Sequence, residues 1–129
     1  MTNYNKYGEV AIKAAKEKGN PKNNWLKEVK KAFFDSESSQ KKSCPKSIFL
    51  GLCEEGLIKG ISQGNYTKSI DNKAYAIEAI NILKRNPKTI YTPKELWIKT
   101  KKELFIIKKD YNSQMDIVLA LWENELIVK

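Results

Sequence analysis

Two segments of this chain repeat an earlier stretch of sequence, and this internal similarity constrains the fold more than any other feature does. Residues 21–34 read PKNNWLKEVKKAFF and residues 93–106 read PKELWIKTKKELFI, with six identities in fourteen positions. Residues 47–58 read SIFLGLCEEGLI and residues 116–127 read DIVLALWENELI, with six identities in twelve positions. Because both pairs occur in the same order, the sequence predicts a duplicated structural unit.

The chain length limits how such a unit can be organised. At 129 residues the chain supports one hydrophobic core and not two independent ones. We predict a single all-α domain over residues 1–129, made of two tandem three-helix repeats related by an approximate twofold axis. The repeats span residues 5–61 and 70–129, and a linker spans residues 62–69. Chance similarity between amphipathic helices is the alternative explanation.

Apolar periodicity and start signals predict the first two helices of each repeat. The apolar face of the first helix comprises Tyr7, Val10, Ala11, Ala14 and Ala15 in one copy, and Tyr75, Ala76, Ala79, Ile80 and Leu83 in the other. The second helix begins at Asn20-Pro21 and at Thr92-Pro93, where a capping residue precedes proline, and Glu95 completes a capping-box pattern. We expect Trp25 and Trp97 to be equivalent, largely buried anchors of these helices.

The third helix of each repeat is the most apolar. It is expected to begin near Ser43 in one copy and at Ser113 in the other, where serine is a favoured capping residue. In the first copy an apolar arc covers more than half of the helix circumference, and it comprises Ile48, Phe49, Leu52, Cys53 and Leu57. A helix of this kind is buried on most sides. We therefore expect the third helices at the centre of the fold.

Histidine is absent and cysteine occurs only twice, which removes most familiar enzymatic sites. Without His, the common zinc sites and the Ser-His and Cys-His nucleophile pairs cannot form. Cys44 and Cys53 are nine positions apart, so one helix would point them to nearly opposite sides, where they can neither bridge nor share a metal. We predict no catalytic residue, no metal and no cofactor.

The net charge of +9 results from 23 lysines and one arginine against 15 acidic residues. Lysine suits phosphate contacts, whereas base readout in DNA grooves relies on arginine. Lysines three and four positions apart give the second helix of each repeat a basic face. The candidate phosphate-binding residues are Lys22, Lys27, Lys30, Lys31, Lys94, Lys99 and Lys102, with Lys101 at the place of Val29 in the second copy. The predicted partner is nucleic acid, bound without sequence preference, or an acidic protein.

Other interpretations of the charge stay open. An AT-rich coding bias also enriches lysine, which leaves a protein-interaction or scaffold module whose basic surface is incidental. The third helices are the acidic part of each repeat, which argues against a helix that enters the major groove. No aromatic residue is evident on the basic faces, which weakens an interpretation as a single-strand binder.

A small-ligand site is a further candidate. Lys41, Lys42 and Cys44 lie at the expected start of a helix, where backbone N–H groups and cations favour an anion or a thiolate. Asn65 and Tyr66 lie in the linker, where two repeats would face each other and form a cleft. The alternatives are a structural cysteine and an ordinary turn. A thiol-dependent or small-ligand enzyme at the repeat interface is the third functional class.

Three strings in the sequence resemble a known family: SQKKSCPKSIFLGLCEEGLIKGI, GNYTKS and NSQMDIVLALW. They resemble a family of small bacterial proteins of unknown function, which implies a bacterial origin and a compact helical fold and transfers no activity. The longest apolar runs, residues 48–53 and 117–122, are far shorter than the roughly 20 residues that cross a membrane. We expect a cytoplasmic protein that does not bind membranes, and its oligomeric state stays open.

Overall fold

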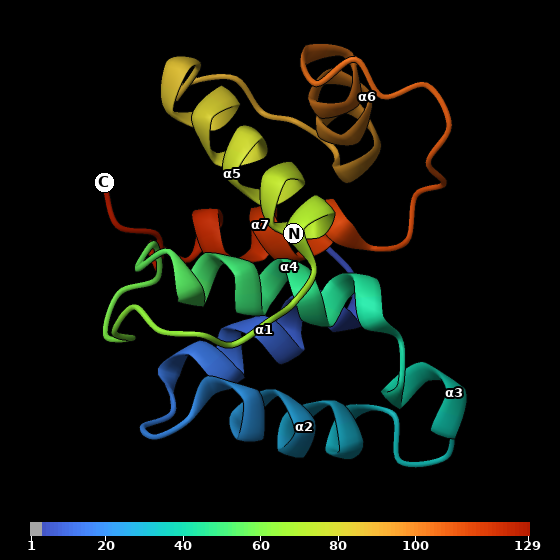
Figure 1. Ribbon diagram of the computed structural model, residues 1–129, viewed down its shortest axis with the longest axis vertical. Helices are drawn as coiled ribbons and strands as arrows, with labels where there is room; N and C mark the ends of the chain where they lie inside the picture. Colours follow the sequence, from blue (N-terminus) through green and yellow to red (C-terminus); the bar gives the residue numbers. More distant parts are fainter. Residues whose placement is uncertain (1–3) are drawn as a thin grey trace.

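The computed structural model describes residues 4–129 and is all-helical over that range, with helices stacked in three layers (Figure 1). Seven helices are formed: α1 (Lys6–Lys16), α2 (Pro21–Ala32), α3 (Glu37–Gln40), α4 (Ser43–Glu54), α5 (Ile70–Arg85), α6 (Pro93–Glu103) and α7 (Gln114–Glu123). The expected all-α fold is confirmed, and the single turn α3 was not expected. No helix within residues 4–129 has both the length and the apolar character needed to cross a membrane.

The local start signals decide where most of these helices begin. The Asn20 side chain accepts hydrogen bonds from two backbone N–H groups of α2. Thr92 and Glu95 form the expected capping box at the start of α6. α7 begins directly after Ser113, as expected, but this residue has a left-handed backbone (φ 64°) and its side chain caps no N–H of α7. Its hydroxyl accepts a hydrogen bond from the Asn5 side chain instead.

The hydrophobic core is centred on α4 and α7, as their wide apolar arcs predict. Six of the residues of α4 and six of α7 are apolar and buried: Ile48, Phe49, Leu50, Leu52, Cys53 and Pro45 in α4, and Met115, Ile117, Val118, Leu119, Ala120 and Leu121 in α7. Trp25 is 0% exposed and Trp97 is 3% exposed, so the prediction that both indoles are buried is confirmed. The core therefore passes through all three layers.

The outer layers cross over between the two halves of the chain. α1 packs against α7, and α5 packs against α4, so each outer helix contacts the central helix of the other half. Both crossings are close. A β-carbon at Gly8 of α1 would lie 2.9 Å from the Ala120 Cβ of α7, and one at Gly51 of α4 would lie 3.1 Å from the Lys73 Cα of α5.

The segments that follow the two central helices turn in the same way and then pair with each other. The left-handed residues Gly56 (φ 70°) and Glu125 (φ 58°) end α4 and α7. In each case the N–H of the next leucine bonds at 3.0 Å to the carbonyl five residues earlier. An isolated antiparallel bridge then joins Ile58 to Ile127. Two hydrogen bonds of 2.8 Å flank it, from the Lys59 N–H to the Leu126 carbonyl and from the Val128 N–H to the Leu57 carbonyl.

Candidate anion-binding surface

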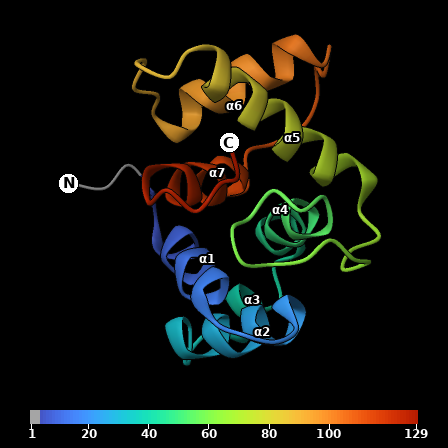
Figure 2. The same ribbon diagram turned by 90° about the vertical axis from the view of Figure 1, so that its left-hand side faces the viewer.

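The two lysine-rich helices lie at opposite ends of the molecule. α2 is in the lower layer and α6 is in the upper layer along the longest axis, and a view turned by 90° gives the same arrangement (Figure 2). The central helices α4 and α7 separate them. The basic faces of α2 and α6 therefore do not merge into one surface, and each end has to be described separately. We call them the α2 end and the α6 end.

At the α2 end, carboxylates neutralise half of the predicted lysines. Lys27 forms an ion pair with Glu17, which lies in the turn between α1 and α2. Their mutual hydrogen bond lowers the pKa of Glu17 and raises the pKa of Lys27. Lys31 lies 3.7 Å from Glu28 on the same helix. Lys22 and Lys30 are exposed and have no ion pair with another described residue.

At the α6 end, the lysines have no carboxylate partner within the described part of the chain. This holds for Lys94, Lys99, Lys101 and Lys102. The two glutamates of α6 are already engaged, because Glu95 belongs to the capping box and Glu103 accepts a hydrogen bond from Arg85 at 3.3 Å. The α6 end therefore presents uncompensated positive charge to its surroundings.

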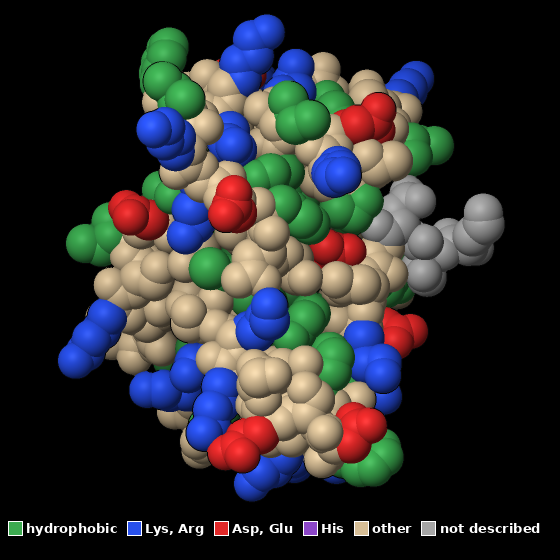
Figure 3. Space-filling model, turned by 90° about the vertical axis from the view of Figure 1, so that its right-hand side faces the viewer, with side chains coloured by type: hydrophobic (Ala, Val, Ile, Leu, Met, Phe, Trp, Pro, Cys, Tyr) green, Lys and Arg blue, Asp and Glu red, His purple; other side chains and the backbone are tan. Residues whose placement is uncertain are grey.

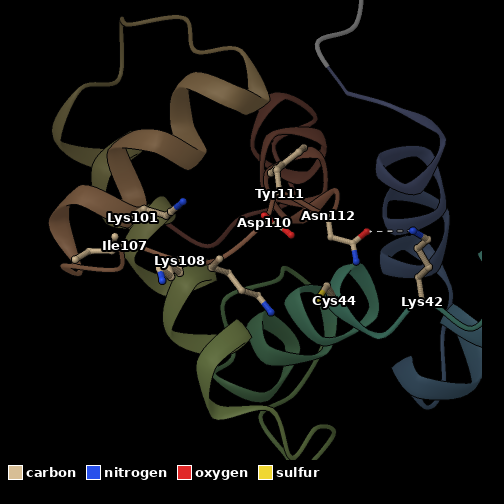
Figure 4. A pocket seen from close by; sticks show the side chains of 9 residues that line it. Lys42, Cys44, Lys101, Ile107, Lys108, Asp110, Tyr111 and Asn112 are labelled. Carbon is tan, nitrogen blue, oxygen red and sulfur yellow. Dashed lines mark hydrogen bonds between the residues drawn. The ribbon is translucent and has the colours of Figure 1, made fainter.

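A hollow of about 830 Å³ lies beside α6 and is lined by lysines from three segments (Figure 4). Lys42 and Cys44 come from the start of α4, Lys101 comes from α6, and the other residues come from the loop between α6 and α7. We call it the basic pocket, and its lining residues are Lys42, Cys44, Lys101, Ile107, Lys108, Lys109, Asp110, Tyr111 and Asn112. Four lysines face one aspartate, which favours an anionic occupant.

Tyr111 and Asn112 hold the wall of this pocket in place. The Tyr111 hydroxyl donates a hydrogen bond to the carboxylate of Asp116 in α7, and its ring packs 5.8 Å from that of Trp97. Burial is the main cause that raises the pKa of Asp116, and burial with this hydrogen bond raises the pKa of Tyr111. The Asn112 side chain accepts a hydrogen bond from the Lys42 ammonium group at 3.5 Å. The loop is thereby tied to both α4 and α7.

A second, smaller hollow lies at the end of α6. It has a volume of about 310 Å³, and its lining residues are Lys99, Lys102, Glu103 and Phe105. We call it the Phe105 hollow. Phe105 is 91% exposed, whereas the aligned Phe33 is half-buried. On the side of the molecule that Figure 3 shows, hydrophobic side chains lie among lysines over the upper part of the surface.

The other predicted ligand residues lie elsewhere. Lys41 forms an exposed ion pair with Glu37 at 2.8 Å. Tyr66 lies beside the far end of α4, where its backbone N–H donates to Glu54 at 2.7 Å. Asn65 and Tyr66 line a hollow of about 220 Å³ together with Lys22. The structure therefore brings Lys42 and Cys44 together in the basic pocket and places Lys41, Asn65 and Tyr66 outside it.

The two cysteines differ in access. Cys44 is half-buried in the basic pocket, whereas Cys53 is 0% exposed, and burial raises the pKa of its thiol. Both thiols are free. Between residues 4 and 129 no group of three potential metal ligands of the His, Cys, Asp or Glu types is found.

Comparison with known proteins assigns the chain to a family. The profile of a family of unknown function, DUF6979, matches residues 4–128. The chain belongs to the DUF6979 family. This confirms the expected membership of an uncharacterised family, and the DUF6979 description assigns no activity. No curated protein matches the chain. No solved structure matches it either.

Sequence analysis missed several residues of these two hollows. Lys108, Lys109 and Tyr111 were not predicted because no helix or motif contains them. Phe105 was not singled out, because its alignment with Phe33 gives no sign that its ring is exposed. One signal was present: residues 101–109 read KKELFIIKK, in which two lysine pairs flank an apolar run at the end of a basic helix.

Proposed function

We propose that the protein is a non-enzymatic binding module that contacts nucleic-acid phosphates through the α6 end and the basic pocket. The observation that carries this proposal is the convergence of lysines without carboxylate partners. Lys99 and Lys102 of α6 flank the Phe105 hollow, and Lys101, Lys108 and Lys109 face the basic pocket. A polyanion that follows this surface gains several charge contacts at once.

The chemistry of these cations favours phosphates over base edges. A lysine ammonium is a point charge that binds phosphate oxygens and carries no fork for a base pair. The one arginine, Arg85, is engaged by Glu78 at 3.4 Å and Glu103 at 3.3 Å. We therefore expect binding that is nearly independent of sequence and that weakens steeply with salt.

The α2 end plays the smaller part in this proposal. The sequence predicts equal contributions from the two lysine faces, because they occupy matching places in the two repeats. In the structure a nucleic acid would have to displace Glu17 from Lys27 and Glu28 from Lys31. Counterion release falls when a cation is already neutralised by a protein carboxylate.

A protein-interaction module is the second candidate, favoured by exposed apolar side chains near α6. Ile90 is 83% exposed, Ile98 is 63% exposed and Ile107 is 86% exposed. Apolar side chains grouped among polar ones occur at protein interfaces. For a partner that uses them the basic surface is incidental, and its binding would depend on these isoleucines more than on salt.

Fluorescence anisotropy at low salt with labelled duplexes of unrelated sequence tests the proposal. We expect the duplexes to bind with similar affinity and to lose affinity steeply as salt rises. Polyglutamate of similar charge serves as the control for an acidic protein, and we expect it to compete weakly. Lack of binding to any nucleic acid at low salt would contradict the proposal, since a protein of net charge +9 then has its greatest electrostatic advantage.

Cys44 provides an independent report on the pocket. Its half-buried thiol lines the basic pocket, so a bound polyanion should slow its alkylation several-fold. The fully buried Cys53 stays unlabelled in the folded protein and serves as an internal control. Alkylation of Cys44 at the same rate with and without saturating nucleic acid would place the binding surface away from this pocket.

We also propose that the fold consists of two three-helix repeats about an approximate twofold axis. The proposal is supported by the reciprocal hydrogen bonds around Ile58 and Ile127, which occupy equivalent positions in the aligned sequences. It is supported further by the two close crossings, in which Gly8 meets Ala120 and Gly51 meets Lys73. In the alignment Ala120 corresponds to Gly51, and Lys73 corresponds to Gly8, so the two crossings involve the same pair of positions.

A further inference from the structure

We infer that the nucleic acid bound at the α6 end is single-stranded and that Phe105 is the ring on which one of its bases stacks. This inference rests on the proposed function and adds the class of nucleic acid to it. It starts from an aromatic side chain that lies outside the core and beside lysines without carboxylate partners.

Phe105 is directed away from the core while its neighbours are directed toward it. Leu104 and Ile106 are half-buried and pack against the hydrophobic core. Phe105 is 91% exposed, and its ring contacts no other aromatic ring among residues 4–129. Packing within this chain therefore does not explain why a phenylalanine occupies the position.

The backbone at Phe105 disfavours a residue of this kind. Its φ of 57° lies in the left-handed region, where a side chain with a β-carbon is strained and glycine is not. The turns that end α4 and α7 have the same left-handed backbone, at Gly56 (φ 70°) and at Glu125 (φ 58°). At residue 105 the protein thus holds an exposed aromatic ring at a conformational cost, and such strained positions concentrate at functional sites.

The surroundings of the ring determine what it can bind. Lys99 and Lys102 line the Phe105 hollow, whose 310 Å³ is at the lower end of the volumes of small-molecule sites. Binders of single strands combine backbone-tracking cations with exposed aromatic rings on which bases stack. A duplex keeps its bases stacked inside, so it offers phosphates to the lysines and no free base to the ring.

Phe34 provides a matched comparison at the other end of the molecule. It is 82% exposed and follows α2, four and three positions after Lys30 and Lys31. Its φ is not positive, and it lines none of the hollows described above. Removal of Phe34 therefore deletes an equally exposed ring without touching the Phe105 hollow.

The test measures binding of a labelled oligothymidine and of a duplex of the same length to the full chain at fixed low salt. The proteins are the wild type, Phe105→Ala, Phe105→Leu, Phe105→Trp and Phe34→Ala. We expect Phe105→Ala to lose about 5- to 150-fold in single-strand affinity, the equivalent of the roughly 1–3 kcal/mol measured for one stacked base. Its duplex affinity should stay within about twofold.

The other variants separate stacking from general apolarity and from folding. Phe105→Trp should keep single-strand affinity because indole also presents a π face, and Phe105→Leu should lose it although leucine is apolar. Phe34→Ala should leave both affinities unchanged. Circular dichroism checks that every variant is folded, which we expect because both rings are more than 80% exposed.

The outcomes distinguish this inference from the proposed function. If Phe105→Ala binds the single strand as tightly as the wild type while the duplex still binds, the nucleic-acid proposal stands and stacking on Phe105 is wrong. Equal losses for the single strand and the duplex also contradict stacking. If the wild type binds neither nucleic acid, the proposed function fails, and the inference fails with it.

Discussion

The α2 end and the α6 end derive from similar sequences and differ in how their charge is balanced. Both helices begin with Pro-Lys, bury a tryptophan and carry a run of lysines. At the α2 end two of the four predicted lysines pair with Glu17 and Glu28, whereas the lysines of α6 have no such partner among the described residues. A count of lysines alone does not reveal this difference.

Two local sequence changes explain it. Thr100 stands in α6 where α2 has Glu28, and its hydroxyl donates a hydrogen bond to the Leu96 carbonyl at 2.7 Å. The turn before α6, residues 86–92, contains no acidic residue that could take the place of Glu17. Loss of an acid thus leaves positive charge uncompensated as effectively as gain of a base does.

The largest losses of stability should come from substitution of the buried tryptophans, and the losses should be similar at the α2 end and the α6 end. Trp25 stacks 5.4 Å from Phe49, and Trp97 meets Tyr75 at 5.4 Å. We expect Trp25→Ala and Trp97→Ala each to lower the free energy of unfolding by about 3–5 kcal/mol, because a large cavity is left in the core. Urea denaturation measures this. A loss below about 1 kcal/mol at either position would mean that the two indoles are not equivalent anchors.

The next largest losses of stability should come from substitutions at Gly8 and Gly51, where helices cross closely, and the two losses should differ in size. A methyl group at Gly8 would lie 2.9 Å from both the Ala120 Cβ and the Asp116 backbone oxygen, so we expect Gly8→Ala to destabilise the fold by about 1–3 kcal/mol. At Gly51 the nearest atoms lie at 3.1 Å, and part of the strain is offset by alanine's helix propensity, about 1 kcal/mol. Thermal denaturation of both variants should show the smaller loss for Gly51→Ala, and the reverse order would contradict this packing.

A carboxylate at the C-terminal end of α4 makes the stability of the fold depend on pH. Hydrogen bonds from Lys73 and from the backbone of Tyr66 and Thr67 lower the pKa of Glu54 to about 2. A carboxylate with a lowered pKa stabilises the folded state above its unfolded pKa and loses that contribution as pH falls. Between pH 4.5 and pH 2 we expect a loss of about 1–2 kcal/mol, moderated by solvent near the ion pair. In Glu54→Gln this part of the pH profile should disappear, and an unchanged profile would assign the acid sensitivity to another group.

The smallest effect concerns the ion pair of Lys27. We expect Lys27→Gln to lower the free energy of unfolding only slightly, as is usual for exposed ion pairs, and the matched Lys99→Gln to leave it unchanged. Raising the salt concentration should abolish the difference between the two variants. Equal stability of both at low salt would show that the Lys27–Glu17 pair contributes nothing.

The sequence predicts the helices and the core of this protein well, because those features depend on local signals. Periodic apolar residues identified the faces of α1 and α5, and the Thr92–Glu95 pair marked the start of α6. At Ser113 the start of α7 was predicted correctly, but the left-handed backbone and the bond to Asn5, which depend on tertiary contacts, were not.

The candidate site was predicted only in part. Lys42 and Cys44 were identified by their place before a helix, but the pocket also needs the loop over residues 104–113, which Tyr111 fastens to Asp116. No periodic pattern reveals a loop of this kind. Nor does the alignment of Phe105 with Phe33 reveal that one ring is 91% exposed and the other half-buried.

The difference between the two ends is the central claim, and the salt dependence of single-strand binding tests it most directly. Lys99→Gln/Lys102→Gln and Lys27→Gln/Lys30→Gln each remove two positive charges from matching positions. The slope of log affinity against log salt changes by about 0.7 for each phosphate contact on a single strand. We predict that the first pair lowers the slope by about 1.4 and that the second pair lowers it by at most about half as much, because Lys27 is already paired with Glu17. Equal reductions, or a larger one for the α2 pair, would contradict the account.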